Sequence, residues 1–234
     1  MNVIQPANRD PNDSAAKPPA HEVVYRQLRD LVLFGDLAPG EAVTIQGLVD
    51  TLGAGMTPVR EAIRRLIAEG ALRFQGNRRV SVPILSVAEL EEILFLRKTV
   101  ESQLTKRAAG RITKDDITTL TQIDATLDAA ILNGDVPGYL KANYDFHMTL
   151  YARADAPILL GVADQLWLRF GPSLRVVCGR FGTENLPDQH KELLAALASG
   201  DAQAAAQAMV EDVAQGTTQM AQVLKETDET TRFD

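Results

Sequence analysis

The chain contains, at residues 57–66, the stretch Thr57-Pro58-Val59-Arg60-Glu61-Ala62-Ile63-Arg64-Arg65-Leu66. Thr57 is a suitable N-cap, because its hydroxyl can accept a hydrogen bond from an N–H group of the first helical turn. Pro58 then fits the first helical position, where a missing N–H costs nothing. Arg60 and Arg64 share one face, and apolar residues form the opposite stripe. This pattern predicts a recognition helix for DNA, although an ordinary amphipathic surface helix with solvated arginines has the same pattern.

The sequence on either side of this helix favours a winged helix-turn-helix. Two helices are expected upstream, and a short glycine-containing turn at 53–56 joins the second of them to the predicted recognition helix. Downstream, residues 72–82 alternate like the two strands of a β-hairpin, with Arg78 and Arg79 at its tip. We therefore predict three helices followed by a β-hairpin wing.

Charge divides the chain into two parts. The whole chain carries a formal net charge of −7. Residues 21–83 hold eight basic and seven acidic residues, a net +1, whereas residues 84–234 hold fourteen basic and twenty-two acidic residues, a net −8. Residues 60–79 alone contain six arginines against two glutamates, so the basic cluster is local and suits phosphate. The second part therefore has a role other than DNA binding.

Residues 21–83 resemble the winged helix-turn-helix domain of the GntR family of bacterial transcription regulators. The match rests on the turn Leu37-Ala38-Pro39-Gly40, on residues 52–62 and on the ending Leu66…Glu69-Gly70. The family usually has an arginine directly before the Thr-Pro pair and often a basic residue near the start of the preceding helix, where this chain has Met56 and Gln46. The resemblance implies DNA contacts at Gln46, Met56, Thr57, Pro58, Arg60, Arg64, Arg78 and Arg79.

A length of 234 residues with 45% hydrophobic residues predicts two folded domains. We expect a disordered tail at 1–20, the DNA-binding domain at 21–83, an all-α domain at 84–225 and a flexible tail at 226–234. The N-terminal tail lacks the apolar stretch of a signal peptide, and no apolar run is long enough to span a membrane. The single cysteine, Cys178, excludes an internal disulfide. These features predict a cytoplasmic protein with no membrane partner.

Residues 84–225 predict one helix after another. The first begins at a capping box formed by Ser86 and Glu89. Breaks near residues 110–113, 134–137, 154–157, 182–187 and 199–201 divide the segment into about six helices in all. The predicted fold is therefore mainly α, with a winged helix-turn-helix followed by an all-α bundle.

Five polar residues fall on the apolar stripes of four of these helices, namely Arg97, Asn143, His147, His190 and Asp212. Buried polar groups are costly unless they are satisfied, so these five are expected to satisfy one another around something bound. Two imidazoles, a carboxylate and an amide oxygen suit a divalent cation such as Zn²⁺, Mn²⁺ or Ni²⁺. Arg97 would complement a carboxylate on a ligand that also touches the metal. A core histidine bonded to a backbone carbonyl explains each imidazole equally well, so these residues alone leave the metal open.

Residues 88–222 resemble the ligand-binding FCD domain of the FadR-like branch of the same family, notably at 96–101, 143–147 and 190–197. In metal-binding members of that branch, an Asp or Asn and a His four residues apart hold a metal ion together with two further histidines. Asn143, His147 and His190 match the first three positions, and Asp212 replaces the fourth. This replacement either shifts the metal preference towards Mn²⁺ or Mg²⁺, because aspartate is a harder ligand, or marks a pocket that works without a tightly bound metal.

The resemblance implies a transcription regulator without enzyme activity, bound as a homodimer to double-stranded, pseudo-palindromic operator DNA. We expect a repressor that is released by a small organic acid held by Arg97 and the metal. One alternative is a metal-dependent helical enzyme fused to a DNA-binding domain, which would need a general base beside the metal; Asp145 lies on the wrong helical face for that role. Another is an effector-independent DNA-binding dimer, which Met56 and Asp212 leave open.

Overall fold

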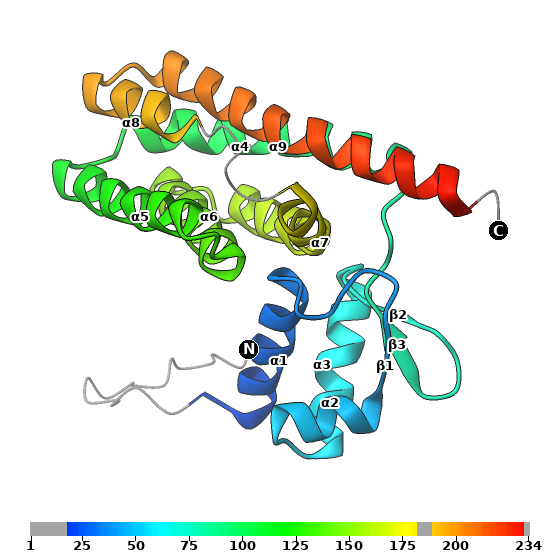
Figure 1. Cartoon of the computed structure of the whole chain (residues 1–234). Coiled ribbons are helices and arrows are strands. Elements are labelled where there is room, and N and C mark those ends of the chain that lie inside the picture. The colour runs from blue at the N-terminus through cyan, green and yellow to red at the C-terminus, as the bar shows by residue number, and fades with distance from the viewer. Residues whose placement is uncertain (1–17, 182–188, 232–234) are drawn as a thin grey trace, which may run out of the picture.

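The computed structural model describes residues 18–181 and 189–231 of the chain. Its N-terminal part is a winged helix-turn-helix, in which three helices pack together beside a small antiparallel sheet (Figure 1). The elements of this part are α1 (Ala20–Leu33), β1 (Ala42–Thr44), α2 (Ile45–Leu52), α3 (Met56–Ala68), β2 (Arg73–Phe74) and β3 (Arg79–Ser81).

The wing contains one strand more than the sequence predicted. β3 pairs with β2 as expected and with β1 on its other side, so the strand order is β1-β3-β2. A strand of three residues is too short to show a detectable alternation of apolar and polar residues, which is why the sequence did not predict β1. At the hairpin tip Asn77 and Arg78 have φ angles of 45° and 58°. The turn therefore holds Arg78 in a backbone conformation that non-glycine residues adopt only at an energetic cost.

Helix α3 begins earlier than predicted. Its first residue is Met56 and its N-cap is Gly55, which has no side chain to cap with. The prediction that Thr57 is the N-cap was therefore wrong, and Thr57 and Pro58 occupy the second and third helical positions. Pro58 is tolerated there because the first four N–H groups of a helix have no partner within the helix.

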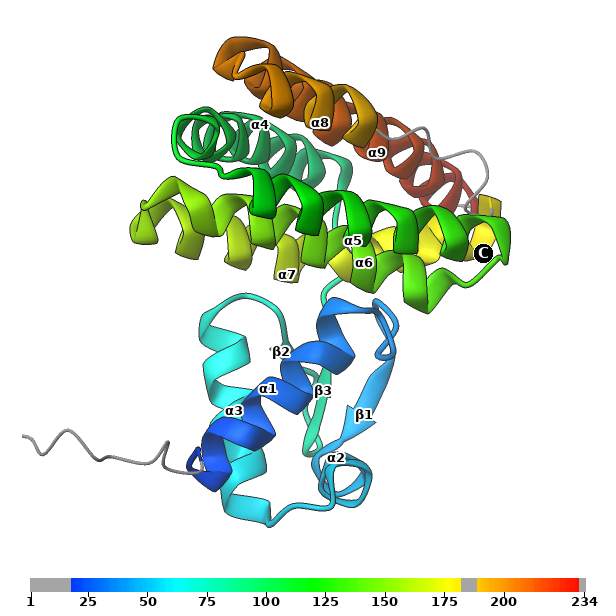
Figure 2. The same ribbon diagram turned by 90° about the vertical axis from the view of Figure 1, so that its left-hand side faces the viewer.

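The C-terminal part is an all-α bundle, as expected, and its helices form two layers. In Figure 2, α4, α8 and α9 form the layer far from the N-terminal domain, and α5, α6 and α7 form the layer next to it. Among the described residues the elements are α4 (Val87–Ala109), α5 (Lys114–Leu132), α6 (Val136–Tyr151), the short 3₁₀ turn η1 (Ala152–Ala154), α7 (Pro157–Phe181), α8 (His190–Ser199) and α9 (Ala202–Thr231).

The ends of these helices follow local sequence signals. The predicted capping box is confirmed, since the Glu89 N–H donates to Ser86 Oγ at 3.2 Å and the Ser86 N–H donates to Glu89 Oε2 at 2.8 Å. The predicted break at 182–187 lies outside the described residues, as does nearly all of the tail predicted at 1–20. Helix α9 continues to Thr231, beyond residue 225, where we expected it to end. Among the residues that the structure describes, none of the helices has both the length and the apolar composition needed to cross a membrane.

The two parts of the chain meet where α1 packs against α7. Trp167 and Leu168 of α7 belong to the apolar core of the N-terminal domain. At Gly171 the two helices are so close that a Cβ atom would overlap the carbonyl oxygen of Leu33. Because this contact leaves no room for even one methyl group, the position of α7 fixes the position of α1.

Candidate functional site

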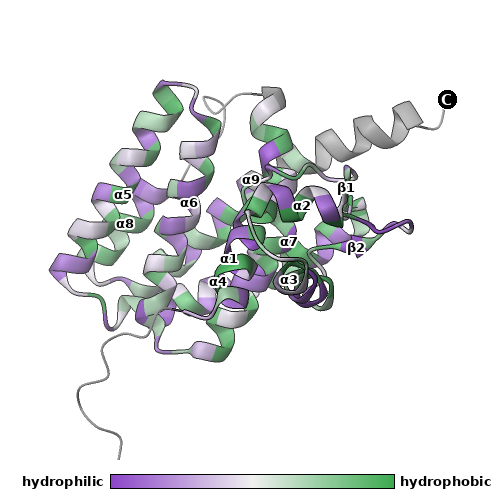
Figure 3. Cartoon of the chain, turned by 90° about the horizontal axis from the view of Figure 1, so that it is seen from below, coloured by the Kyte–Doolittle hydropathy of each residue, from purple (hydrophilic) through white to green (hydrophobic). Residues whose placement is uncertain are grey.

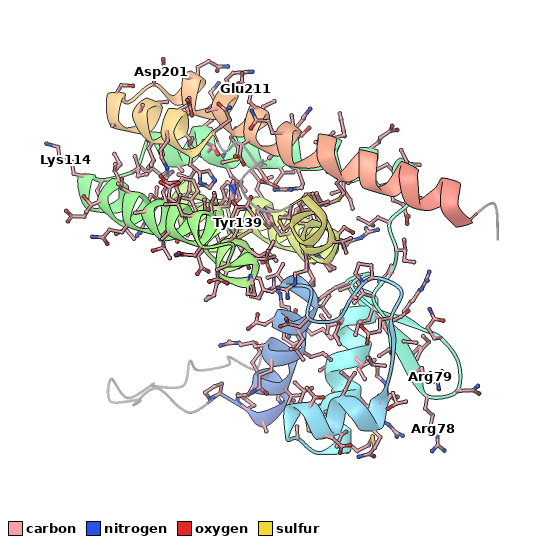
Figure 4. The ribbon with its side chains drawn as sticks, in the orientation of Figure 1. Arg78, Arg79, Lys114, Tyr139, Asp201 and Glu211 are labelled. Atoms are coloured by element: carbon pink, nitrogen blue, oxygen red, sulfur yellow. The ribbon has the colours of Figure 1, made fainter. Side chains whose placement is uncertain are left out.

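Helix α3 and the wing form one open groove. Arg60 and Arg64 of α3 line it together with Phe74 and Arg78 of the wing, and its volume is about 370 Å³. Figure 3 shows hydrophilic residues along α3 and on the wing, and Figure 4 shows Arg78 and Arg79 extending from the wing tip away from the protein. An open groove lined by guanidinium groups suits the phosphates and base edges of DNA.

The other predicted DNA-contact residues do not line this groove. Gln46 is exposed in the first turn of α2, where its amide donates a hydrogen bond of 3.0 Å to Asp50. Arg79 is exposed at the start of β3. The remaining three lie in the first turn of α3, where the middle one is exposed and its two neighbours are half-buried: Met56, Thr57 and Pro58. Contact between these residues and DNA stays a prediction.

Three of the four predicted metal ligands converge inside the bundle. His147 of α6, His190 of α8 and Asp212 of α9 offer ligand atoms that all lie within 4.8 Å of one another. His147 Nε2 lies 3.3 Å from Asp212 Oδ2, and His190 Nε2 lies 3.9 Å from Asp212 Oδ1. Both imidazoles are only 1% exposed. The fourth predicted ligand, Asn143, is also buried and lies one turn before His147 on α6.

Each imidazole is held at Nδ1 by an oxygen atom. His190 Nδ1 donates to Asp124 Oδ1 at 3.1 Å. His147 Nδ1 lies 3.0 Å from the hydroxyl oxygen of Tyr151, which itself donates to Glu101 Oε2 at 2.6 Å. Because the carboxylate of Asp124 and this hydroxyl oxygen both act as acceptors, the proton of each imidazole is placed on Nδ1 and the lone pair on Nε2. Histidines that bind metals are oriented in the same way by groups behind them.

The electrostatics of the cluster favour a cation. Burial lowers the pKa of His147 below its usual value despite the nearby carboxylate of Asp212, so this ring is neutral near pH 7. Burial alone would raise the pKa of Asp212, but the polar groups around it, among them the N–H of Gln189 that donates to Oδ1 at 3.3 Å, hold that pKa below its usual range. Neutral imidazole and ionised carboxylate are the forms in which these groups bind metals, so the residues present fit a divalent ion.

Arg97, the predicted effector-binding residue, is already engaged inside the protein. Its Nε and Nη2 donate to the carboxylate of Glu101 at 2.6 and 3.2 Å. Its Cζ atom lies 4.4 Å from the ring centroids of both Trp167 and Phe170. Burial alone would lower the pKa of Arg97, but Glu101 raises it above its usual value, so the side chain stays charged. Nη1 is the guanidinium nitrogen that Glu101 does not contact.

Sequence analysis gave no role to three residues that hold this site, although each had a signal. Glu101 and Tyr151 each follow a predicted site residue by four positions on the same helix, a spacing at which side chains meet. Asp124 lies on the apolar stripe of α5 that includes Leu120 and Leu127. A carboxylate on an apolar stripe indicates a buried partner, here His190.

Comparisons with known proteins match both parts of the chain. The model of bacterial regulatory proteins of the gntR family matches residues 20–82, and the model of the FCD domain matches residues 92–215. The chain belongs to the GntR family.

Relatives of this GntR-family protein are transcription regulators. The HTH-type transcriptional regulator McbR of Escherichia coli K12 is 30% identical over 181 residues, which cover 76% of this chain and 82% of McbR. The transcriptional repressor RspR of the same organism is 24% identical over 212 residues, which cover 89% of this chain and 92% of RspR. The solved structure of E. coli McbR/YncC has a TM-score of 0.83 at 28% identity and covers 88% of this chain and 99% of that one. The protein is therefore a transcription regulator with a DNA-binding GntR domain and an FCD domain.

Proposed function

We propose that a small carboxylate effector controls DNA binding from a metal-containing pocket around His147, His190 and Asp212. The observation that carries this proposal is the convergence of two buried imidazoles on one carboxylate, with each imidazole held at Nδ1 by an oxygen atom. Asn143, one turn before His147, supplies the fourth ligand in this proposal. A cation between these groups would offset the mutual repulsion of their lone pairs.

A bound divalent ion such as Mn²⁺, Zn²⁺ or Ni²⁺ would supply a Lewis acid for an oxygen atom of the effector. Asp212 makes the ligand set more negative than one with a third histidine and favours a harder ion such as Mn²⁺. Arg97 turns Nη1 towards the effector carboxylate, while Glu101 holds the rest of its guanidinium in place.

We further propose that the protein is a homodimeric repressor that places one winged helix-turn-helix on each half of a pseudo-palindromic operator. In each half-site Arg60 and Arg64 contact the DNA from α3, and Arg78 and Arg79 contact it from the wing. The relative RspR is named a transcriptional repressor, which supports this direction of control. The effector must bind one arrangement of the two DNA-binding domains better than the other, since equal affinity would shift nothing.

The family relatives favour regulation over the alternative of a metal-dependent enzyme, because they are named as transcription regulators. Asp145, the one acidic side chain near His147 in the sequence of α6, forms an ion pair with Lys141 at 3.1 Å on the exposed side of the helix. That position does not suit a general base beside the cluster.

The metal content of the purified protein tests the pocket. We expect about one divalent ion per chain by mass spectrometry, and loss of that ion in the His147→Ala/His190→Ala variant, because two of four ligands are gone. His21→Ala is the matched control, since this third histidine is exposed in α1. Absence of metal from the wild-type protein, with no uptake of added Mn²⁺ or Zn²⁺, would contradict the proposal.

Thermal unfolding of the metal-loaded protein tests the effector. An acid present at a hundred times its Kd should stabilise the protein by about 2.7 kcal/mol and should release operator DNA. A panel of sugar acids, hydroxy acids, amino acids and dicarboxylates that stabilises nothing would favour the effector-independent dimer.

A further inference from the structure

Trp167 carries a buried hydrogen-bond donor that the described residues do not satisfy. It is the single tryptophan of the protein and is 3% exposed. Its indole Nε1 has no hydrogen-bond partner among residues 18–181 and 189–231. A buried N–H without an acceptor keeps the full cost of its desolvation, and native proteins leave few such groups. An acceptor for this donor must come from outside the described residues.

The indole ring lies beside the candidate effector site. Its centroid is 5.0 Å from that of the candidate metal ligand His147, and Cζ of Arg97 is 4.4 Å from the ring centroid. It also contacts Tyr144 at a centroid distance of 5.8 Å, and Tyr144 in turn contacts Phe34 at the end of α1 at 5.9 Å. Trp167 therefore touches the candidate effector site and the joint between the two domains.

None of the polar side chains around the ring accepts a hydrogen bond from the indole. Arg97 has donors only. The hydroxyl of Tyr144 donates to Asp164 at 2.6 Å and accepts from Arg29 at 3.3 Å. His147 uses Nδ1 for Tyr151, and its Nε2 faces the cluster of candidate metal ligands. A ligand atom that reaches this donor from the side of Arg97 and His147 would lie beside a guanidinium, which favours an anionic oxygen.

We propose that Trp167 contacts the effector directly, through a hydrogen bond from its indole N–H to an oxygen of the effector carboxylate. The inference rests on the proposed function and deepens it, because it assigns a recognition residue to the pocket. It also places the bound acid against the Trp167 ring, which contacts Tyr144, and Tyr144 contacts Phe34 at the end of α1. Binding of the acid is thereby sensed at the joint that positions the DNA-binding domain.

The single tryptophan makes the test direct. Full-length protein labelled with ¹⁵N in the tryptophan indole gives one side-chain N–H signal. The labelled protein is titrated with Zn²⁺ alone and then with malonate or lactate, a dicarboxylate and a hydroxy acid, while calorimetry measures binding in parallel. We expect the indole proton signal to move downfield when either acid binds, because an N–H that donates to an anionic oxygen is deshielded.

Substitution supplies a second measurement. Trp167→Phe removes the donor and keeps an aromatic ring, so the Zn²⁺-loaded variant should bind the acid about tenfold more weakly while its Zn²⁺ affinity is unchanged. Phe170→Leu is the matched control. This substitution removes the second aromatic ring that Arg97 contacts, but it removes no hydrogen-bond donor. The affinity of the Phe170→Leu variant for the acid should therefore change much less.

The outcomes separate this inference from the proposal beneath it. Binding of an acid without movement of the indole signal would overturn the role of Trp167 and leave the metal pocket standing. Binding of Zn²⁺ with no response to either acid would also overturn it, because the acceptor assigned here is a carboxylate oxygen. Failure of Zn²⁺ to bind at all would remove the metal pocket itself, and this inference with it.

Discussion

Arginine serves opposite purposes in the two domains. On the DNA-binding domain Arg60, Arg64 and Arg78 line an open groove, and none of them forms an ion pair with a residue that the structure describes. In the bundle Arg97 is 3% exposed and is paired with Glu101, which is fully buried. A charge that is left unpaired at the surface is available to a partner outside the chain, whereas a charge that is buried with its own carboxylate organises the protein.

The same division occurs within α3. Arg65 follows Arg64 directly, but it donates to Glu22 and Glu69 and lies 3.5 Å from the ring centroid of Tyr25. Six arginines in one short stretch therefore do not form a uniform basic surface. The i,i+4 spacing of Arg65 and Glu69 is visible in the sequence, but the second partner of Arg65, Glu22, lies more than forty residues away in the chain.

The largest effect should come from breaking the buried pair. Glu101→Gln leaves the charge of Arg97 uncompensated in the core, so we expect a loss of about 3–5 kcal/mol in the free energy of unfolding, measured with denaturant. Glu91→Gln is the control, because Glu91 is exposed on the same helix and its loss should change stability by less than about 0.5 kcal/mol. Equal stability of the two variants would show that Arg97 does not depend on its partner.

Substitution in the groove should weaken DNA binding without affecting stability. Arg60→Ala and Arg64→Ala should each cost about 1–3 kcal/mol of affinity for a selected operator, measured by fluorescence anisotropy, if each contacts a base. Arg65→Ala is the control on the same helix, since its contacts lie within the protein. An Arg65→Ala variant that loses as much affinity as Arg60→Ala would contradict the division of roles along α3.

The wing should contribute affinity rather than sequence specificity. Loss of Arg78 and Arg79 together should weaken binding to all DNA sequences alike and reduce the slope of log affinity against log salt by about 2, one for each phosphate contact. Titrations at several salt concentrations with selected and random DNA measure both quantities. A change confined to the selected operator would indicate that the wing reads bases.

The smallest effect should come from the arginine at the domain joint. Arg29 of α1 is only 12% exposed, but its partner Asp164 is 39% exposed, so solvent screens the pair. Arg29→Met should therefore change the free energy of unfolding by at most about 1 kcal/mol. A loss as large as that of Glu101→Gln would mean that the joint is held by this pair rather than by its apolar core.

Much of the fold was predictable because its signals are local. The Ser86 capping box, the glycine turn before α3 and the apolar stripes of the bundle are each written within a few consecutive residues. The start of α3 was predicted wrongly because a Thr-Pro pair resembles a helix start even when the preceding glycine can serve as the N-cap. Three of the four candidate metal ligands lie together in the bundle, and each was recognisable as a polar residue on an apolar stripe; their binding of a metal stays a prediction.

The pairing of these residues was less predictable. Asp124 and His190 are 66 residues apart in the chain and come together only through the packing of α5 against α8. Trp167 gave no signal at all, because a tryptophan on an apolar stripe is expected whether or not its N–H is satisfied. The sequence of a single helix thus predicts which residues lie on its buried face. An unsatisfied hydrogen-bond donor is recognised only when the positions of all the residues packed around it are known.

The close approach of Gly171 to Leu33 has a consequence for how operators are chosen. A single added methyl group at position 171 would push α1, and the DNA-binding domain with it, away from α7. In the proposed dimer the two-fold axis repeats that displacement on the other chain. Both DNA-binding domains move, so the distance between the two recognition helices changes. In that proposed dimer, the absence of a side chain at Gly171 is therefore one of the determinants of the half-site spacing.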